Sequence, residues 1–505
     1  LKRDFIFLRS LFYFMRYYFF IIIFFLSSNP VFSNYEMNSN MKLAYSKILN
    51  LNFTDASKII SIEKNINPNN GLITLNENYI DFLKIIIEED KEYYEKNRVN
   101  KNIRLNHLKK NDDKSPYHLL IQSEIHLQWA FTRIKFNQYF LAAYELQKAY
   151  SLLKKNEQLF PEFILNKKNL GILKILIGSI PEDYSWILNI VGIQASISDG
   201  FDDLYSLLEI CETNKEVSIY TSEILFYLSF LEMNMRNNEF AQKKLLEKIE
   251  NCCQKNDLMI FCSARLSLRL GQNDRAIQIL ENRNNNNFYF HYLDYLYAMS
   301  VMYKQDYIKA EKYFLQFTDN FRGSNYIKSA YHKLYHISVL TNSIEKQEKY
   351  KYLVLNKGNS LIDEDRRAED EIKNNNPINI DLLTATLLYD GGYYKIALEK
   401  LISIDSLNID NYNHKIEFAY RNARVYQKLE DKKTISYFKK LIGMNNSSNL
   451  YYFPMSNLQI GLEYEKQGNI KQALYYFNQV FDYKDYDYEN GIKKSAQAAI
   501  NRLSN

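Results

Sequence analysis

The sequence predicts an all-α protein built as an elongated solenoid of stacked helix hairpins. Gly (14) and Pro (7) are scarce in a chain of 505 residues, which favours long helices with short connections. A hydrophobic fraction of 46% is sufficient for a packed core. Small residues also recur at a fixed spacing, with steps of 35 and 34 residues from Ala241 to Ala276 and from Ala276 to Ala310. Such a period indicates a repeat architecture.

The N-terminus is expected to direct export. Basic residues precede an apolar run from Tyr17 to Leu26, and Pro30 and small residues follow it, which is the pattern of a secretory signal peptide. We expect cleavage after Ser33, so that residues 1–33 are the signal peptide, with Met15 as an alternative start. An uncleaved anchor is the other reading, although a membrane span needs roughly 20 apolar residues. Either way, the protein is expected in the periplasm or at the outer membrane.

A polar turn followed by an alanine marks each repeat. This alanine begins the second helix of a hairpin, where only a small side chain lets the two backbones approach. The alanines that fit this pattern are Ala56, Ala142, Ala241, Ala276, Ala310, Ala397 and Ala473.

The clearest unit lies near the C-terminus. Gly461, Tyr464, Ala473 and Phe477 follow the spacing L-G-x2-Y, then A-x3-F, with Gly468 in the turn between the helices. On these residues the chain resembles the tetratricopeptide repeat (TPR) family over most of residues 37–503. The resemblance implies a right-handed superhelix whose concave groove is lined by the first helix of each hairpin.

The repeats are degenerate between Ala142 and Ala241 and between Ala310 and Ala397, so we expect irregular hairpins there. In the first of these gaps, residues 170–204 together with 115–163 are similar to a family of uncharacterised exported repeat proteins of Gram-negative bacteria. Gly171, Ser179-Ile180-Pro181 and Gly192 also resemble the eukaryotic outer-mitochondrial-membrane repeat family linked to inclusion-body clearance, from which we transfer no function.

The apolar hairpin 170–193 is expected to be buried inside a helix bundle. Contact with a membrane is the alternative, although each apolar run is too short to span a bilayer.

Composition changes and caps divide the chain into regions. A helix start is expected at Ser115-Pro116, a cap followed by proline in the first turn. The expected regions are the signal peptide (1–33), an N-terminal repeat region (34–115), a helical region with the apolar hairpin (116–210), two sets of repeats (211–345 and 346–486) and a C-terminal capping helix (487–505).

The net charge of +5 arises from 64 basic and 59 acidic residues, so no nucleic-acid partner is expected. The segment Arg98–Lys114, with Lys101 and Arg104, is interpreted as a solvated helix face and loop. Asp363–Asp365 and Glu369–Glu371 alternate with basic residues, which indicates salt-bridged surface in place of paired catalytic carboxylates.

No motif for catalysis or for a cofactor is evident, so we expect neither catalytic residues nor a cofactor. His332 and His336 lie four residues apart, as helical metal ligands do. Because no third ligand is evident, we expect an ordinary helix face and no metal. The cysteines are Cys211, Cys252, Cys253 and Cys262. We expect buried free thiols, and a disulfide from Cys252 or Cys253 to Cys211 or Cys262 in an oxidising periplasm is the alternative.

Two consecutive first helices carry the candidate binding residues. Their groove-facing positions combine two cations with an aromatic strip, which suits a peptide carboxylate and its apolar neighbours. The alternative is that these are ordinary surface and core residues of the repeat. The residues are Phe261, Arg265, Arg269, Tyr292, Tyr295, Met299 and Tyr303.

We therefore expect a non-catalytic scaffold or adaptor of the cell envelope that binds protein or peptide segments. The alternative is a lipid- or glycan-handling helical module in peripheral contact with a membrane face. An α/α-toroid hydrolase is the enzymatic alternative, but two Trp residues and little Gly make its sugar-binding platform difficult to build.

Overall fold

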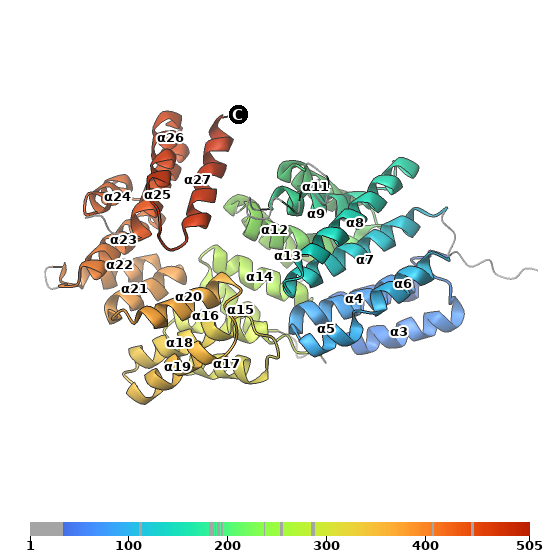
Figure 1. The fold of residues 1–505 in the computed structure, drawn as a ribbon, viewed down its shortest axis with the longest axis horizontal. Helices are drawn as coiled ribbons and strands as arrows, with labels where there is room; N and C mark the ends of the chain where they lie inside the picture. The colour runs from blue at the N-terminus through green and yellow to red at the C-terminus, as the bar shows by residue number, and fades with distance from the viewer. Residues whose placement is uncertain are drawn as a thin grey trace, which may run out of the picture. The chain divides into compact units, whose positions relative to one another are not determined.

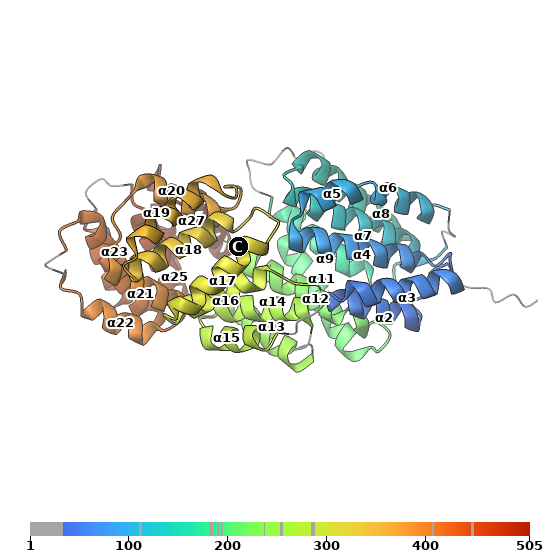
Figure 2. The same ribbon diagram turned by 90° about the horizontal axis from the view of Figure 1, so that it is seen from below.

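The structure is a computed structural model that describes residues 34–110, 114–180, 186, 188, 192, 195–236, 238–252, 256–283, 288–406, 409–445 and 449–504. The predicted signal peptide (1–33) lies outside the described residues. Within them every regular element is a helix and no strand occurs (Figures 1 and 2). The predicted all-α class, a solenoid of packed helix hairpins, is confirmed.

The chain forms two compact units. Unit 1 comprises Leu1–Leu228 and Asn285–Phe288, and unit 2 comprises Ser229–Asn284 and Tyr289–Asn505.

Unit 1 consists of hairpins in which α2 packs on α3, α7 on α8 and α9 on α11, with α4 against α7. Ser115 caps α7 by accepting a hydrogen bond from the Tyr117 backbone amide, with Pro116 in the first turn, as the sequence predicts. The helices are α2 (Ser39–Leu49), α3 (Phe53–Ile66), α4 (Gly71–Glu88), α5 (Lys91–Asn97), α6 (Asn100–Leu108), α7 (Pro116–Lys135), α8 (Tyr139–Leu159), α9 (Asn166–Gly178), α11 (Ile197–Thr213) and α12 (Thr221–Leu231), whose last turn lies in unit 2.

Unit 2 continues the same pattern, with α14 paired to α15, α16 to α17, α18 to α19, α21 to α22, α23 to α24 and α25 to α26. An additional helix, α20, packs against both α18 and α19. The helices are α13 (Glu239–Cys252), α14 (Asp257–Arg269), α15 (Asn273–Glu281), α16 (Tyr292–Tyr303), α17 (Tyr307–Asn320), α18 (Ile327–Leu340), α19 (Ile344–Asn356), α20 (Asp363–Asn374), α21 (Ile380–Asp390), α22 (Tyr394–Ile402), α23 (Tyr412–Lys428), α24 (Thr434–Ile442), α25 (Tyr452–Lys466), α26 (Ile470–Gln479) and α27 (Glu489–Ser504).

The seven repeat alanines are all buried, and six of them are at most 2% exposed. At the crossing of α25 and α26, a Cβ added to Gly461 would lie 2.4 Å from the Phe477 ring. Small residues therefore stand where the helix pairs approach most closely, as the repeat pattern predicts.

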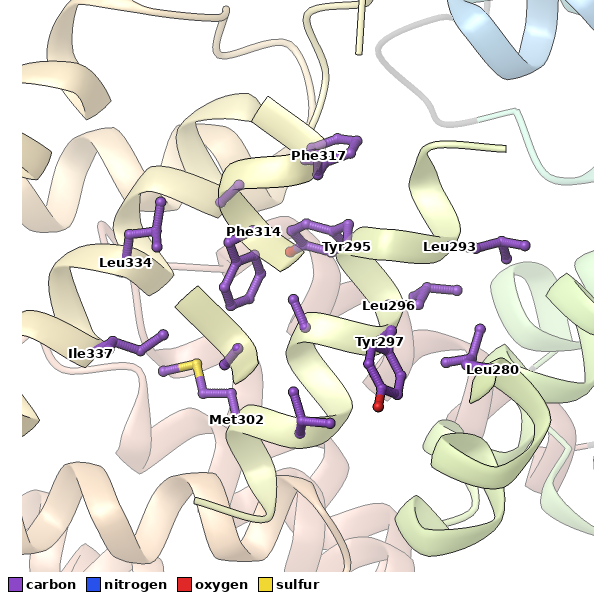
Figure 3. Packing of buried hydrophobic residues seen from close by; sticks show 14 of the residues in the cluster. Leu280, Leu293, Tyr295, Leu296, Tyr297, Met302, Phe314, Phe317, Leu334 and Ile337 are labelled. Atoms are coloured by element: carbon purple, nitrogen blue, oxygen red, sulfur yellow. The ribbon is translucent and has the colours of Figure 1, made fainter. Parts of the chain in front are cut away.

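One core cluster of unit 2 shows how the hairpins are joined. Tyr295 of α16 lies 5.7 Å from Phe314 and 5.5 Å from Phe317 of α17, measured between ring centroids (Figure 3). Leu334 of α18 and Leu387 of α21 belong to the same cluster. Side chains from four helices thus share one apolar core, although Tyr295 and Leu387 lie nearly a hundred residues apart in the sequence.

The stacking order of unit 2 departs from that of a simple array. The turn after α14 and the turn after α21 touch: a Cβ added to Gly392 would lie 1.9 Å from the Gly271 carbonyl oxygen. Both glycines have positive φ, +69° at Gly271 and +79° at Gly392. Beside them, Asn273 donates a hydrogen bond of 3.0 Å to the Tyr393 hydroxyl. In this way α21 reaches α16, although α17–α20 separate the two helices in sequence.

The first half of the predicted apolar hairpin is buried in unit 1. Ile172, Leu173 and Ile175 of α9 are fully buried, and a Cβ on Gly171 would lie 2.8 Å from the Gly200 carbonyl oxygen of α11. Most of the second half of the hairpin lies outside the described residues. None of the helices described in the structure has the length and apolar character required to cross a membrane.

The cysteines differ from the expectation in one respect. Cys211 and Cys262 are buried free thiols, as predicted. Cys252 is in a disulfide, so the prediction of a free thiol was wrong there. Cys253 lies outside the described residues.

Candidate functional site

Tyrosine and arginine side chains form a connected surface in unit 2. Helices α14, α16, α21 and α23, each the first of its hairpin, supply most of them. They are partly buried or exposed, and short contacts link one to the next. We call this surface the Tyr–Arg face and define it by Arg265, Tyr292, Tyr303, Tyr326, Arg367, Tyr389, Asp390, Arg421, Arg424, Tyr451, Tyr452 and Tyr488.

Arg265 anchors one end of the Tyr–Arg face. Its guanidinium donates a hydrogen bond of 3.1 Å to the Tyr292 hydroxyl, and the Tyr292 ring lies 4.7 Å from the Tyr326 ring. The interaction with Tyr292 is the main reason that the pKa of Arg265 is raised above its usual value, because it outweighs the effect of burial. The Tyr292 hydroxyl therefore orients this cation.

Arg424 occupies a similar position on α23. It donates hydrogen bonds of 2.8 Å and 3.1 Å to the Tyr389 hydroxyl, and it lies 5.6 Å from the Tyr389 ring centroid. One turn earlier, Arg421 forms an ion pair of 3.0 Å with Glu417. Beyond Arg421 lie Tyr451 and Tyr452, whose ring centroids are 4.3 Å apart.

Asp390, at the end of α21, lies among the cations of the face. It interacts electrostatically with Arg421, Lys333, Arg367 and Arg424, which come from three other helices. Although the Asp390 side chain reaches solvent, the surrounding protein raises the pKa of its carboxyl in spite of these cations. Asp390 thus places a negative charge among the cations of α18, α20 and α23.

Two cations of the face form no direct ion pair with a carboxylate of the described residues. Within the described residues, Arg265 and Arg424 form no ion pair, whereas Arg367 pairs with Glu371 and Arg421 with Glu417. Guanidinium groups bind carboxylates through paired hydrogen bonds. Arg265 and Arg424 are thus positioned to accept carboxylates from another molecule.

The residues predicted to line the groove are distributed between this face and the core. Phe261, Arg265 and Tyr292 lie together, with the Phe261 and Tyr292 ring centroids 6.0 Å apart. Arg269 is exposed at the end of α14. Met299 is partly buried and packs on the core cluster.

Tyr295 and Tyr303 differ from one another. Tyr295 is 5% exposed and its hydroxyl is hydrogen-bonded to the Ser329 hydroxyl at 2.8 Å. Its assignment as a groove residue was wrong, because its position in α16 points into the shared core. Tyr303 is partly exposed and interacts electrostatically with Asp390 of α21.

Arg367, Asp390, Arg421 and Arg424 were not singled out from the sequence. Their helices join the face through the non-sequential contact between α16 and α21, which a 34-residue period does not encode. The only local signal is that Arg421 and Arg424 lie three residues apart, on one face of α23.

The acidic helix α20 is less exposed than the expected salt-bridged surface. Asp365 is fully buried and accepts hydrogen bonds from the Tyr326 and Ser329 backbone amides at 2.6 Å and 2.8 Å. These hydrogen bonds satisfy backbone amides at the start of α18, which have no partner within the helix. Glu371 is partly buried and ion-paired to Arg367 at 2.5 Å.

Unit 1 holds a buried ionic network that the sequence did not indicate. Lys168 of α9 pairs with Glu124 of α7 at 2.9 Å and with Glu223 of α12 at 2.8 Å. The Tyr79 hydroxyl lies within hydrogen-bonding distance of both carboxylates and can donate its one hydrogen to either. Tyr45 donates a hydrogen bond of 2.5 Å to Glu223. All five side chains are at most 5% exposed. Each charge comes from a different helix, so no spacing in the sequence reveals the set.

The network continues through amide side chains toward α6. Gln128 bridges Glu124 and Asn78, and Asn78 accepts a hydrogen bond of 3.1 Å from Arg104, which pairs with Asp81 at 2.6 Å. Space beside the Lys168 pairs amounts to about 20 Å³, enough for a single water molecule. This network has no room for a ligand, and we assign it a structural role.

A second buried group centres on Glu145. Its carboxylate pairs with Lys101 at 2.5 Å, His126 at 2.6 Å and Arg133 at 3.0 Å. The interpretation of Lys101 and Arg104 as part of a solvated helix face was therefore wrong. Both side chains are largely buried because carboxylates from α8 and α4 neutralise them.

Several solved structures are similar to the chain. The structure described as the APC/C hetero-tetramer Cut9-Hcn1 is 8% identical, covers 91% of this chain and 95% of that chain, and has a TM-score of 0.26. Yeast Tom70 is 13% identical, covers 92% of this chain and 96% of that chain, and has a TM-score of 0.24. The P58(IPK) TPR domain is 12% identical, covers 83% of this chain and 98% of that chain, and has a TM-score of 0.20. At these scores we draw no argument from them. No curated protein matches the chain.

A family match is found over residues 69–377, more than half of the chain, and its description is Iml2/Tetratricopeptide repeat protein 39. This range includes residues 170–204, on which the resemblance to the mitochondrial family rested, and the similarity extends well beyond them. Together with the hairpin architecture and the buried repeat alanines, it shows that the chain belongs to the Iml2/Tetratricopeptide repeat protein 39 family.

Proposed function

We propose that this protein is a non-catalytic scaffold that binds an acidic segment of a partner protein on the Tyr–Arg face. The observation that carries the proposal is the pair of arginines, Arg265 and Arg424, that form no direct ion pair within the described part of the chain. A tyrosine hydroxyl already orients each of them. A ligand carboxylate would therefore meet pre-organised cations, which reduces the entropic cost of binding.

The tyrosines supply the second part of recognition. Tyr451, Tyr452 and Tyr488 offer ring faces and hydroxyls on the same surface, and tyrosine combines a large apolar area with a polar tip. An acidic segment with apolar or aromatic side chains beside its carboxylates matches this surface. The all-helical repeat fold, which commonly presents extended surfaces to protein segments, agrees with such a partner.

We further propose that the protein is exported. The support is the N-terminal pattern of basic residues, a short apolar run and small residues before Ser33. The expected mature N-terminus in exported protein is Asn34, which N-terminal sequencing or intact mass would identify. A mature protein that keeps residues 1–33 would contradict it.

The other candidate functions have less support. The apolar helix α9, the first half of the segment suggested for membrane contact, is buried within unit 1. An α/α-toroid hydrolase has a different fold from the repeat family to which the chain belongs.

Reversing the charge of both unpaired arginines tests the binding proposal. Crosslinking of the full chain in its own cells, followed by mass spectrometry, first identifies the partner segment, which is then made as a labelled peptide. Charged hydrogen bonds contribute about 1.5–3 kcal/mol each, so Arg265→Glu with Arg424→Glu should weaken peptide binding at least about a hundredfold. Fluorescence anisotropy measures this change.

Arg366→Glu is the matched control, because Arg366 is exposed on α20 and pairs with Asp363 outside the face. It should leave the affinity unchanged. Neutralising the acidic residues of the peptide should reproduce the loss seen with the double variant. Equal binding by the double variant and the wild type would remove the Tyr–Arg face as the recognition surface.

A further inference from the structure

Three potential metal ligands converge between α18 and α20. His332 and His336 lie on one face of α18, with their ring centroids 4.1 Å apart, and Glu371 of α20 stands beside them. One ligand atom from each residue lies within 4.8 Å of the others. From the sequence no third ligand was evident, and α20 supplies one through the extra packing of this helix on α18.

The two histidines are more buried than residues on an ordinary helix surface. His332 is 4% exposed and His336 is 7% exposed. Nε2 of His332 lies 3.1 Å from Oε2 of Glu371, whereas the buried Nδ1 of His336 has no hydrogen-bond partner. A buried imidazole nitrogen without a partner is costly, and a metal ion would satisfy it.

The two oxygens of the Glu371 carboxylate contact different residues. Oε1 accepts a hydrogen bond of 2.5 Å from Nε of Arg367, and Oε2 is directed to His332. Metal-binding carboxylates are commonly held in this way by a further hydrogen bond, which fixes their orientation. Arg367 is thus a positioning residue, and Oε2 is the free ligand atom.

Charged residues of both signs surround the cluster. Lys333 and Arg367 are the cations that act on both imidazoles, and the Glu371 carboxylate opposes them. The carboxylates of Asp390 and Glu364 lie farther out, where they interact with Lys333. A divalent cation would therefore depend on Glu371 for its negative charge.

We propose that His332, His336 and Glu371 bind a zinc ion. Two imidazole nitrogens and one carboxylate form a ligand set that zinc prefers, with a fourth position open to water or to a ligand. Two ligands about 2.0–2.1 Å from zinc at a tetrahedral angle lie about 3.3 Å apart. The His332–Glu371 distance of 3.1 Å is close to this value, and the three ligand atoms lie within 4.8 Å of one another, so His336 would have to move closer on binding.

Zinc at this position would clamp α20 onto α18. Because Arg367 belongs to both the site and the Tyr–Arg face, the ion would also fix one cation of that face. The zinc proposal itself does not depend on the proposed peptide binding, because its test uses metal alone.

The test titrates metal into the purified full chain after chelation, with any purification tag removed. Isothermal titration calorimetry with Zn²⁺ should give one ion per chain, and Co²⁺ should produce the visible absorption of a tetrahedral site. His336→Ala and Glu371→Gln should each weaken Zn²⁺ binding by about a hundredfold or more, and Arg367→Met by roughly 10- to 100-fold.

Glu369→Gln is the matched control, because Glu369 lies on the same helix but pairs with Lys328 and Lys373. It should bind Zn²⁺ like the wild type. Circular dichroism establishes that each variant is folded, and the partly exposed Glu371 makes its variant the less disruptive one. Absence of stoichiometric Zn²⁺ binding, or wild-type affinity in folded Glu371→Gln, would overturn the proposal.

Discussion

Replacing Lys168 by methionine is expected to lower the free energy of unfolding of unit 1 by about 3–5 kcal/mol. The change removes the cation from between Glu124 and Glu223 and leaves two buried carboxylates facing one another. Both Trp residues of the chain, Trp129 and Trp186, belong to unit 1. Urea unfolding followed by tryptophan fluorescence therefore reports on this unit.

Lys167→Met provides the matched control, because the neighbouring Lys167 donates only to the Ser206 hydroxyl at 3.3 Å. It should change the free energy of unfolding by less than about 0.5 kcal/mol. Adding Glu124→Gln and Glu223→Gln to Lys168→Met should restore much of the loss, since neutral replacement of a buried ionic group is often tolerated. A small effect of Lys168→Met itself would show that the ionic network contributes little.

The same network sets the acid response of unit 1. Burial raises the pKa of Glu124, but Lys168 and Tyr79 more than offset it, so the pKa lies below its usual value of about 4.3. A carboxyl with a lowered folded-state pKa stabilises the fold above about pH 4.3, and this contribution is lost as pH falls through the folded pKa.

Without Lys168, burial would raise the pKa of Glu124, so this carboxyl would destabilise the fold above its unfolded pKa. The difference in unfolding free energy between wild type and Lys168→Met should therefore shrink from pH 7 to pH 4. Fluorescence-monitored urea unfolding at several pH values measures it. If this difference in unfolding free energy did not depend on pH, Lys168 would not be the group that lowers the pKa of Glu124.

Gly392→Ala should destabilise unit 2 by about 2–5 kcal/mol. The left-handed conformation of Gly392 costs a residue with a Cβ about 1–2 kcal/mol, and the overlap with the Gly271 carbonyl adds about 1–3 kcal/mol. Because unit 2 contains no Trp residue, the loss should appear in circular dichroism and in faster hydrogen exchange around α14–α16 and α21–α22. The tryptophan transition should not move.

Gly468→Ala separates the two contributions. Gly468 also has a positive φ of +74°, but a Cβ there would meet nothing within 4 Å. Its replacement should cost only the conformational part, about 1–2 kcal/mol. If both variants lose the same stability, the contact between the two turns adds nothing to unit 2.

The fold was largely predictable because its determinants are local. The alanines at the start of each second helix, Gly461 at a helix crossing and the Ser115 cap all act through neighbours within one or two turns or one hairpin. Such residues repeat with the hairpins, so the sequence contains several copies of the same signal. The structure confirms each of them.

The candidate site was only partly predictable, because its contacts join distant segments. Arg265 and Tyr292 lie on adjacent first helices and were identified together. Arg424 joins them through the contact of α21 with α16, and Glu371 joins His332 through the extra helix α20. Lys168 is a further case, since a buried charge is recognisable only once its partners on other helices are known.

The contact between Gly271 and Gly392 also constrains how this protein can evolve. Solenoids usually gain or lose repeats by duplication, because each repeat touches only its neighbours. Here the chain between the two turns begins and ends at the same place, so an added hairpin would push Gly392 away from Gly271. The number of helices in that stretch is thereby constrained.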